Sequence, residues 1–90
     1  MKLEDKVVRR EDLIATDLDG DLVMMDIMTG KYYKLSGVSG DIWEIIEQEV
    51  TVADLIAELM RRYDVAQETC TEQTTAFLQQ LIDKGLVLVK

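Results

Sequence analysis

The stretch that decides the fold is Thr29-Gly-Lys-Tyr-Tyr-Lys-Leu-Ser-Gly-Val-Ser-Gly-Asp-Ile-Trp-Glu-Ile-Ile46. It predicts a tight turn, a very short strand over Lys31–Leu35, a Ser/Gly break and then an amphipathic helix. A strand this short that passes directly into a helix is typical of a sheet edge, where the outer N–H and C=O groups stay unpaired. An open edge beside a helix is a place where an extended peptide can add itself as a further strand.

Upstream of this stretch the sequence predicts a β-meander. Leu13–Leu18 and Asp21–Ile27 are mostly apolar runs separated by Asp19-Gly20, a strong hairpin signal because the turn needs positive φ. Thr29-Gly30 supplies the second turn. The strand Lys31–Leu35 is therefore expected to be the last strand of an antiparallel sheet.

Downstream of the break the apolar residues take up the spacing of helices. A first helix is predicted from about residue 38, a second over 52–63, and a third over about 68–84 that ends at Lys84-Gly85. Trp43 and Ile46 are expected to pack inward. The predicted N-terminal caps are Ser36 or Ser39 for the first helix, Thr51-x-x-Asp54 for the second and Thr69-x-x-Glu72 for the third.

The order of these elements predicts the fold class. Val7-Val8 is a candidate leading strand, and Leu86–Val89 is a short final strand or tail. We expect one α+β domain over residues 1–90, with a three-stranded antiparallel sheet followed by a three-helix bundle. The last two helices and the strand after them resemble a winged helix-turn-helix.

The composition limits the classes of function. The chain has 18 acidic and 10 basic residues and a formal net charge of −8, which disfavours nucleic acid and suits basic partners. It has no His, and Cys70 is its one Cys, so the commonest general base, the commonest zinc ligand and any internal disulfide are missing. We therefore expect a protein that is not an enzyme and has no metal or cofactor.

The same sequence predicts a cytoplasmic location. The N-terminus Met-Lys-Leu-Glu-Asp-Lys lacks the apolar region of a signal peptide. No apolar run approaches the length that spans a bilayer, so no membrane partner is expected.

Three motifs have a functional and a structural interpretation. Asp17-x-Asp19-Gly-Asp21 looks like a calcium loop, but the sixth and twelfth residues are Leu22 and Met28 instead of Gly and Glu, so a hairpin tip is favoured. Cys70 has no His partner and lies on the apolar stripe of its helix, which favours a buried structural role. A winged-helix DNA-binding regulator is disfavoured by the exposed residues expected on the third helix, which are Glu68, Glu72, Gln73, Gln79, Gln80 and Asp83 with Lys84 as the basic one.

The two tyrosines of the predicted edge strand should point to opposite faces. Neighbouring residues in a strand alternate, so one of Tyr32 and Tyr33 is expected to pack on the core. The other would face solvent or a groove, where an amphipathic ring suits peptide contact.

The ordered motifs resemble the PqqD-type family. Leu18–Leu35 is similar to the second and third strands of these proteins, and the resemblance extends from about Leu13 to Val89. One departure is Leu35-Ser36, where many relatives carry Leu-Asn. The other matching segments are Val38-x-x-x-Ile42-Trp43, Thr51–Ile56, Tyr63-Asp-Val65, Phe77-Leu78 and Leu81-Ile-Asp-Lys-Gly-Leu86.

The resemblance implies a stand-alone recognition domain for ribosomally made, post-translationally modified peptides. In such domains the leader of the precursor peptide docks as an added antiparallel strand on the third strand, beside the third helix. The partner is a leader-cleaving cysteine protease in lasso-peptide systems, which we favour, or a radical SAM enzyme in PQQ synthesis. The peptide-binding residues implied here are Lys31, Tyr32, Tyr33, Lys34, Leu35, Gln73, Thr74, Phe77, Leu78, Leu81 and Ile82.

These residues are expected to have different roles in peptide binding. The main chain of Tyr32 to Leu35 would supply affinity, and pockets lined by Thr74, Leu78 and Ile82 would supply selectivity. The alternative is that the same apolar residues of the third helix are buried core. Lys31 and Lys34 would meet acidic leader residues and act mainly on the association rate.

Overall fold

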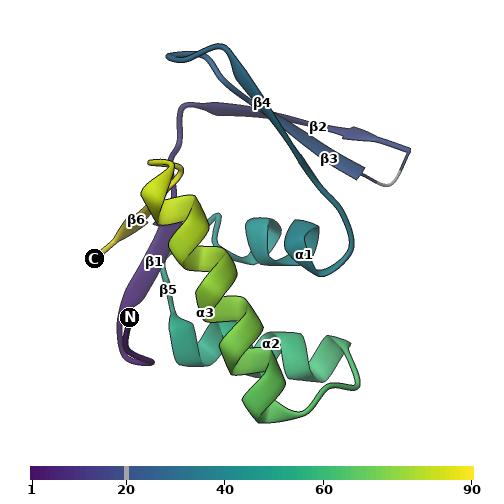
Figure 1. Ribbon diagram of the computed structural model, residues 1–90, viewed down its shortest axis with the longest axis vertical. Coiled ribbons are helices and arrows are strands. Elements are labelled where there is room, and N and C mark those ends of the chain that lie inside the picture. The colour runs from purple at the N-terminus through teal and green to yellow at the C-terminus, as the bar shows by residue number, and fades with distance from the viewer. Residues whose placement is uncertain (20) are drawn as a thin grey trace.

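The computed structural model describes residues 1–19 and 21–90. In Figure 1 the sheet made by β2, β3 and β4 lies at the top of the molecule, and all three helices lie below it. No helix in the described ranges is long and apolar enough to cross a membrane. The elements follow in the order β1 (Lys6–Arg9), β2 (Leu13–Leu18), β3 (Asp21–Asp26), β4 (Lys31–Leu35), α1 (Val38–Ile45), β5 (Val50–Thr51), α2 (Val52–Arg62), α3 (Gln67–Asp83) and β6 (Val87–Val89).

The predicted meander is confirmed and is called the hairpin sheet below. Its strand order is β2–β3–β4, antiparallel throughout, so β4 lies at an edge as expected. Gly30 closes the second turn: its φ is 72°, and its N–H donates to the carbonyl of Asp26 at 2.7 Å. In the predicted Asp19-Gly20 turn, Asp19 has a φ of 53°, and Gly20 lies outside the described residues.

A second sheet has the strand order β5–β1–β6. Val7 of β1 lies opposite Val50 of β5 and Val89 of β6, so the predicted leading and final strands pair with each other. The α+β class is confirmed. The predicted arrangement of one sheet followed by a helix bundle is not confirmed, because β1, β5 and β6 form this second sheet and β5 lies between α1 and α2. The likeness to a winged helix-turn-helix stays a prediction.

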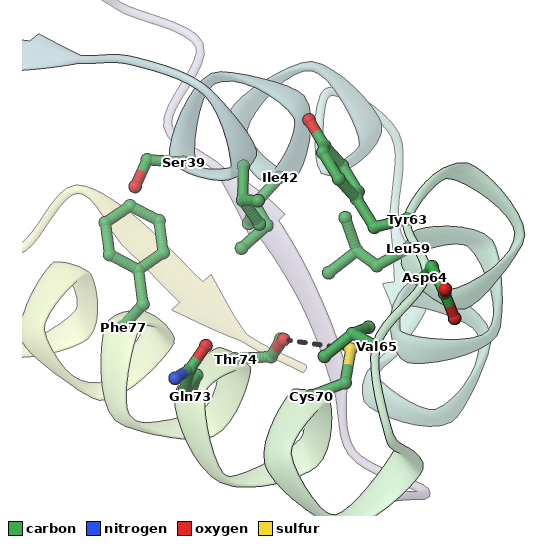
Figure 2. A pocket seen from close by; sticks show the side chains of 11 residues that line it. Ser39, Ile42, Leu59, Tyr63, Asp64, Val65, Cys70, Gln73, Thr74 and Phe77 are labelled. Atoms are coloured by element: carbon green, nitrogen blue, oxygen red, sulfur yellow. Dashed lines mark hydrogen bonds between the residues drawn. The ribbon is translucent and has the colours of Figure 1, made fainter.

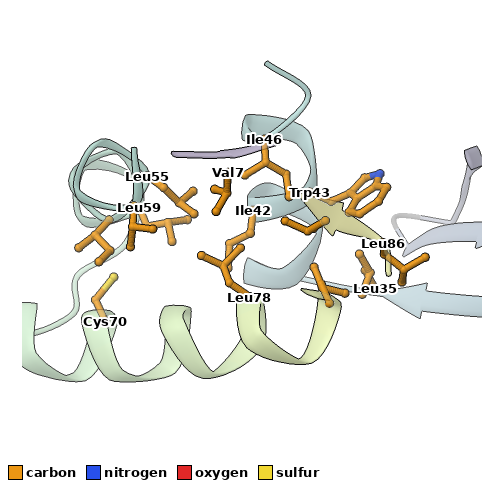
Figure 3. Packing of buried hydrophobic residues seen from close by; sticks show 14 of the residues in the cluster. Val7, Leu35, Ile42, Trp43, Ile46, Leu55, Leu59, Cys70, Leu78 and Leu86 are labelled. Atoms are coloured by element: carbon orange, nitrogen blue, oxygen red, sulfur yellow. The ribbon is translucent and has the colours of Figure 1, made fainter. Parts of the chain in front are cut away.

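The core joins the three helices to both sheets (Figure 3). Trp43 and Ile46 are buried, as expected, and the guanidinium of Arg9 lies 5.3 Å from the Trp43 ring centroid. Cys70 is a free, buried cysteine, which confirms its expected place on the apolar stripe of the third helix. The largest fully buried side chains are Trp43, Met24, Ile46, Leu55, Leu59, Leu78, Leu86, Val7 and Val52.

The helix ends agree with the predictions in part. Thr51 caps α2, and its Oγ1 accepts the N–H of Asp54 at 3.0 Å. Gly85, with a φ of 75°, follows the end of α3 as predicted. The serine caps of the first helix are wrong, because Gly37 holds the N-cap position of α1 with a φ of 59° that favours glycine. The Thr69 cap is also wrong, because α3 already begins at Gln67 with Ala66 at its N-cap.

Candidate functional site

The site begins at β4, one open edge of the hairpin sheet. In the described part of the chain β4 pairs with β3 on one side, and no strand lies on the other. Its side chains alternate as expected, since Tyr32 is 71% exposed whereas Tyr33 is half-buried and Leu35 is buried. The ammonium group of Lys84, at the end of α3, lies 5.4 Å from the Tyr33 ring centroid. The inner face of β4 therefore meets the C-terminal end of α3.

An apolar cavity of about 350 Å³ lies among α1, the end of α2 and α3. We call it the α1–α3 cavity. Figure 2 shows Ser39 and Phe77 at one end, Tyr63 and Asp64 at the other, and Thr74 with Cys70 on the α3 side. Its lining residues are Val38, Ser39, Ile42, Leu59, Tyr63, Asp64, Val65, Cys70, Gln73, Thr74 and Phe77.

The end of the edge strand β4 lies close in sequence to the residues that line this cavity. β4 ends at Leu35, and α1 begins at Val38, whose side chain is 43% exposed and lines the cavity. Across from α1, Phe77 of α3 is half-buried and packs against the core cluster. A peptide paired with β4 would thus find an apolar hollow just beyond the end of that strand.

Polar contacts close the far end of the α1–α3 cavity. The hydroxyl of Tyr63 donates to Asp41 of α1, and this hydrogen bond, aided by burial, raises the pKa of Tyr63. Arg62 lies 3.6 Å from the same carboxylate. These contacts tie the end of α2 to the first turn of α1, which fixes one wall of the cavity.

The chemistry inside the cavity suits binding. The Sγ of Cys70 lies 3.8 Å from Oγ1 of Thr74, and both residues are buried. No group of three His, Cys, Asp or Glu side chains that could hold a metal ion occurs among residues 1–19 and 21–90. The cavity offers mainly apolar surface with a hydroxyl from Ser39 and an amide from Gln73 at its border, an arrangement that fits an apolar side chain of a ligand.

The structure separates the predicted site residues into three groups. Lys31–Leu35 form the open edge, and Gln73, Thr74 and Phe77 line the α1–α3 cavity. Ile82 is half-buried against the core. Leu78 and Leu81 are 0% and 4% exposed, which favours the alternative that these two residues belong to the core.

Several cavity residues were missed by the sequence prediction. Val38, Ile42, Tyr63 and Val65 line the cavity, but the sequence prediction named them only within segments that resemble the PqqD-type family. The signal present in the sequence was that Val38 directly follows the Ser/Gly break. That signal does not say which other helix faces Val38, because the answer depends on tertiary packing.

An ion pair between the buried Asp26 and the partly exposed Arg10 holds the hairpin sheet against the end of α3. Asp26 is 2% exposed, and its carboxylate lies 3.3 Å from Nη1 of Arg10 and accepts the N–H of Met28 at 3.0 Å. Nη1 of Arg10 also donates to the carbonyl of Gly85 at 3.1 Å. Asp12 accepts two further hydrogen bonds from this guanidinium, which lower the pKa of Asp12 and help to raise that of Arg10.

We expect Asp26→Asn to destabilise the protein by about 2 kcal/mol, because the amide loses the charge-assisted hydrogen bonds to Arg10 in a buried place. The measurement is urea unfolding followed by the fluorescence of Trp43. The matched control is Asp12→Asn, which removes a carboxylate from the same guanidinium, but at a side chain that is 57% exposed. Equal losses in the two variants would contradict a special role for the buried pair.

Comparison with known proteins identifies the family of this small α+β domain. The chain belongs to the PqqD family, because the family model described as coenzyme PQQ synthesis protein D (PqqD) matches residues 21–87. No curated protein matches the chain.

Two solved structures share the fold. A structure of TbiB1 in complex with the TbiA(beta) leader peptide is 22% identical in sequence, with a TM-score of 0.81, and the match covers 89% of this chain and 93% of that one. A lasso peptide synthetase B1 complexed with the leader peptide is 21% identical, with a TM-score of 0.79, and the match covers 91% of this chain and 96% of that one.

Proposed function

We propose that this chain binds the leader of a ribosomally synthesised precursor peptide by strand addition at β4 and delivers it to a processing enzyme. The observation that carries the proposal is the open edge of β4, which leads into the α1–α3 cavity. The two structures of the same fold are complexes with leader peptides, which supports the same ligand class here. In this proposal the domain binds and presents the peptide and carries out no chemistry of its own.

The direction of the bound peptide follows from the strand. β4 runs from Lys31 to Leu35 and then enters α1. A peptide that pairs antiparallel therefore enters beside Leu35, with its preceding residues near the α1–α3 cavity, and leaves beside Lys31. The leader precedes the core peptide in the precursor, so the core peptide leaves at the Lys31 end of β4.

Main-chain and side-chain contacts have separate roles in this arrangement. The backbone of β4 supplies hydrogen bonds that any extended peptide can use, and the cavity beyond Leu35 selects for an apolar residue. Leu78 and Leu81 support the packing from the core and make no contact with the peptide. Lys31 and Tyr32 stay available at the exit of the peptide.

The processing enzyme is proposed to be a leader-cleaving cysteine protease, as in lasso-peptide biosynthesis. The lasso peptide synthetase B1 complex supports this choice. The family description points to a second candidate, a PQQ-type chaperone for a radical SAM enzyme. The two are separated by adding the chain to each enzyme with its own precursor: an accelerated cleavage supports the first, and an accelerated modification supports the second.

Leader binding is tested by titrating the chain into a fluorescently labelled leader of the precursor peptide proposed as its ligand. We expect the anisotropy to rise and saturate in the micromolar range or below, with a scrambled leader of the same composition as the control. Because strand addition rests on backbone hydrogen bonds and apolar contact, the affinity should change little between low and moderate salt. No binding up to high micromolar concentration would refute the proposal. Binding of a DNA duplex with a steep salt dependence would favour a nucleic-acid regulator instead.

A further inference from the structure

The outer face of the hairpin sheet carries exposed apolar side chains. The inner face holds the buried Met24 and Leu35, so by alternation their strand neighbours point outward. An antiparallel sheet with one solvated face usually has polar residues there. Here Ile14, Met25 and Tyr32 lie directly opposite one another across all three strands.

We call this row, together with the exposed apolar residues near it, the outer sheet face. Ile14 is 48% exposed and Tyr32 71%, and Leu18 on the same face of β2 is 54% exposed. The turn between β3 and β4 adds Ile27 and Met28, exposed by 58% and 79%. All three helices lie on the other side of the sheet in Figure 1, so no helix of residues 1–19 and 21–90 covers this face. Exposed apolar residues gathered in this way mark an interaction surface.

We propose that the outer sheet face docks the processing enzyme that acts on the bound peptide. This inference rests on the proposed function, because the docking partner is the enzyme that receives the core peptide. The proposal assigns to that enzyme a complementary apolar surface. It also assigns different surfaces to the two partners, with the peptide at the free edge of β4 and the enzyme on the outer sheet face.

The position of the face relative to the peptide favours the enzyme as its occupant. An antiparallel peptide leaves β4 beside Lys31, where the turn residues Ile27 and Met28 are exposed. An enzyme seated on the outer sheet face would therefore lie next to the core peptide as it emerges. Tyr32 belongs to both surfaces, since its side chain lies on the face and its backbone lies in the edge strand.

The charge of the chain disfavours a second copy as the occupant. Each copy carries a net charge of −8, and like charge opposes self-association. On the face itself the ammonium of Lys34 lies 3.1 Å from the carboxylate of Asp21, so the two charges offset each other beside the apolar row. The face also has fewer residues than the roughly 20–30 per side of a standard stable interface, which suits a partner that must dissociate after each delivery.

The test uses Ile14→Glu, a change on β2 that is far from the free edge of β4. The matched control is Leu88→Glu on β6, where the side chain is 45% exposed, compared with 48% for Ile14. The probe is the leader-cleaving cysteine protease proposed above as the partner, immobilised and titrated with each variant by biolayer interferometry. Leader affinity is measured by anisotropy with the same preparations, and the oligomeric state by sedimentation velocity.

We expect Ile14→Glu to weaken protease binding roughly tenfold or more, because it puts a charge into an apolar contact, while leader affinity stays unchanged. Leu88→Glu should leave both affinities unchanged. Unaltered protease binding by Ile14→Glu would overturn the proposal. The proposal would also be overturned if the wild-type chain forms a dimer and Ile14→Glu is a monomer, because the outer sheet face would then bind a second copy of the chain. If the wild-type chain does not bind the leader at all, the proposed function is refuted. The titration of the protease in the absence of peptide would still decide whether the outer sheet face docks this enzyme.

Discussion

Val38→Asp should weaken leader binding about 10- to 100-fold and leave the fold intact. Each tenfold change corresponds to about 1.4 kcal/mol of binding free energy. Val38 lines the α1–α3 cavity, and a carboxylate placed there must lose its hydration when an apolar peptide side chain enters. The substitution therefore acts against the complex and has little effect on the free protein.

The fold should tolerate this change for a specific reason. Val38 is the first residue of α1 and is 43% exposed, so an aspartate there stays hydrated in the free protein. A negative charge in the first turn also interacts favourably with the helix dipole, by about 0.3–1 kcal/mol. The free energy of unfolding of Val38→Asp should thus equal or slightly exceed that of the wild-type chain.

The measurement combines leader anisotropy with urea unfolding. The matched control is Met60→Asp, which puts the same charge on an apolar residue of α2 that is 37% exposed and does not line the α1–α3 cavity. We expect Met60→Asp to bind the leader like the wild-type chain. If Val38→Asp also keeps wild-type affinity, the peptide does not use this cavity, and strand addition at β4 would have to act without it.

Local signals in the sequence predicted most of the fold. The turn at Thr29-Gly30 and the short strand Lys31–Leu35 follow from residues that are adjacent in the chain, and both are confirmed. The pairing of β1 with β5 and β6 could not be predicted in this way, because it joins segments from both ends of the chain. The cap at Gly37 was missed because a serine side chain is the stronger N-cap signal, whereas the backbone here takes a φ that favours glycine.

The site was predicted less completely than the fold, also for a physical reason. Helical period identifies an apolar stripe, but it does not say which part of a broad stripe faces the core. On α3 the neighbours Phe77 and Leu78 both belong to the predicted site, yet one lines the cavity and the other is fully buried. The difference arises because α1 and the end of α2 approach one side of α3, which no local pattern encodes.

This difference gives a prediction of opposite effects at neighbouring positions. Leu78→Ala should lower the free energy of unfolding by about 2–5 kcal/mol, because Leu78 is 0% exposed and its truncation leaves a void in the core. Phe77→Ala should destabilise the chain less, since this ring is only half-buried. Its main effect should be on leader affinity, which we expect to fall about tenfold as the wall of the α1–α3 cavity is lost.

Each variant serves as the control for the other, because both replace a large apolar residue of α3 by alanine one position apart. Stability is measured by urea unfolding, and affinity by anisotropy at a temperature where unfolding curves show that Leu78→Ala is folded. Under those conditions Leu78→Ala should bind the leader close to the wild-type affinity, because Leu78 supports the site only from the core. A large loss of affinity for folded Leu78→Ala, together with unchanged affinity for Phe77→Ala, would place the peptide against the side of α3 that carries Leu78 and would move the site away from the cavity.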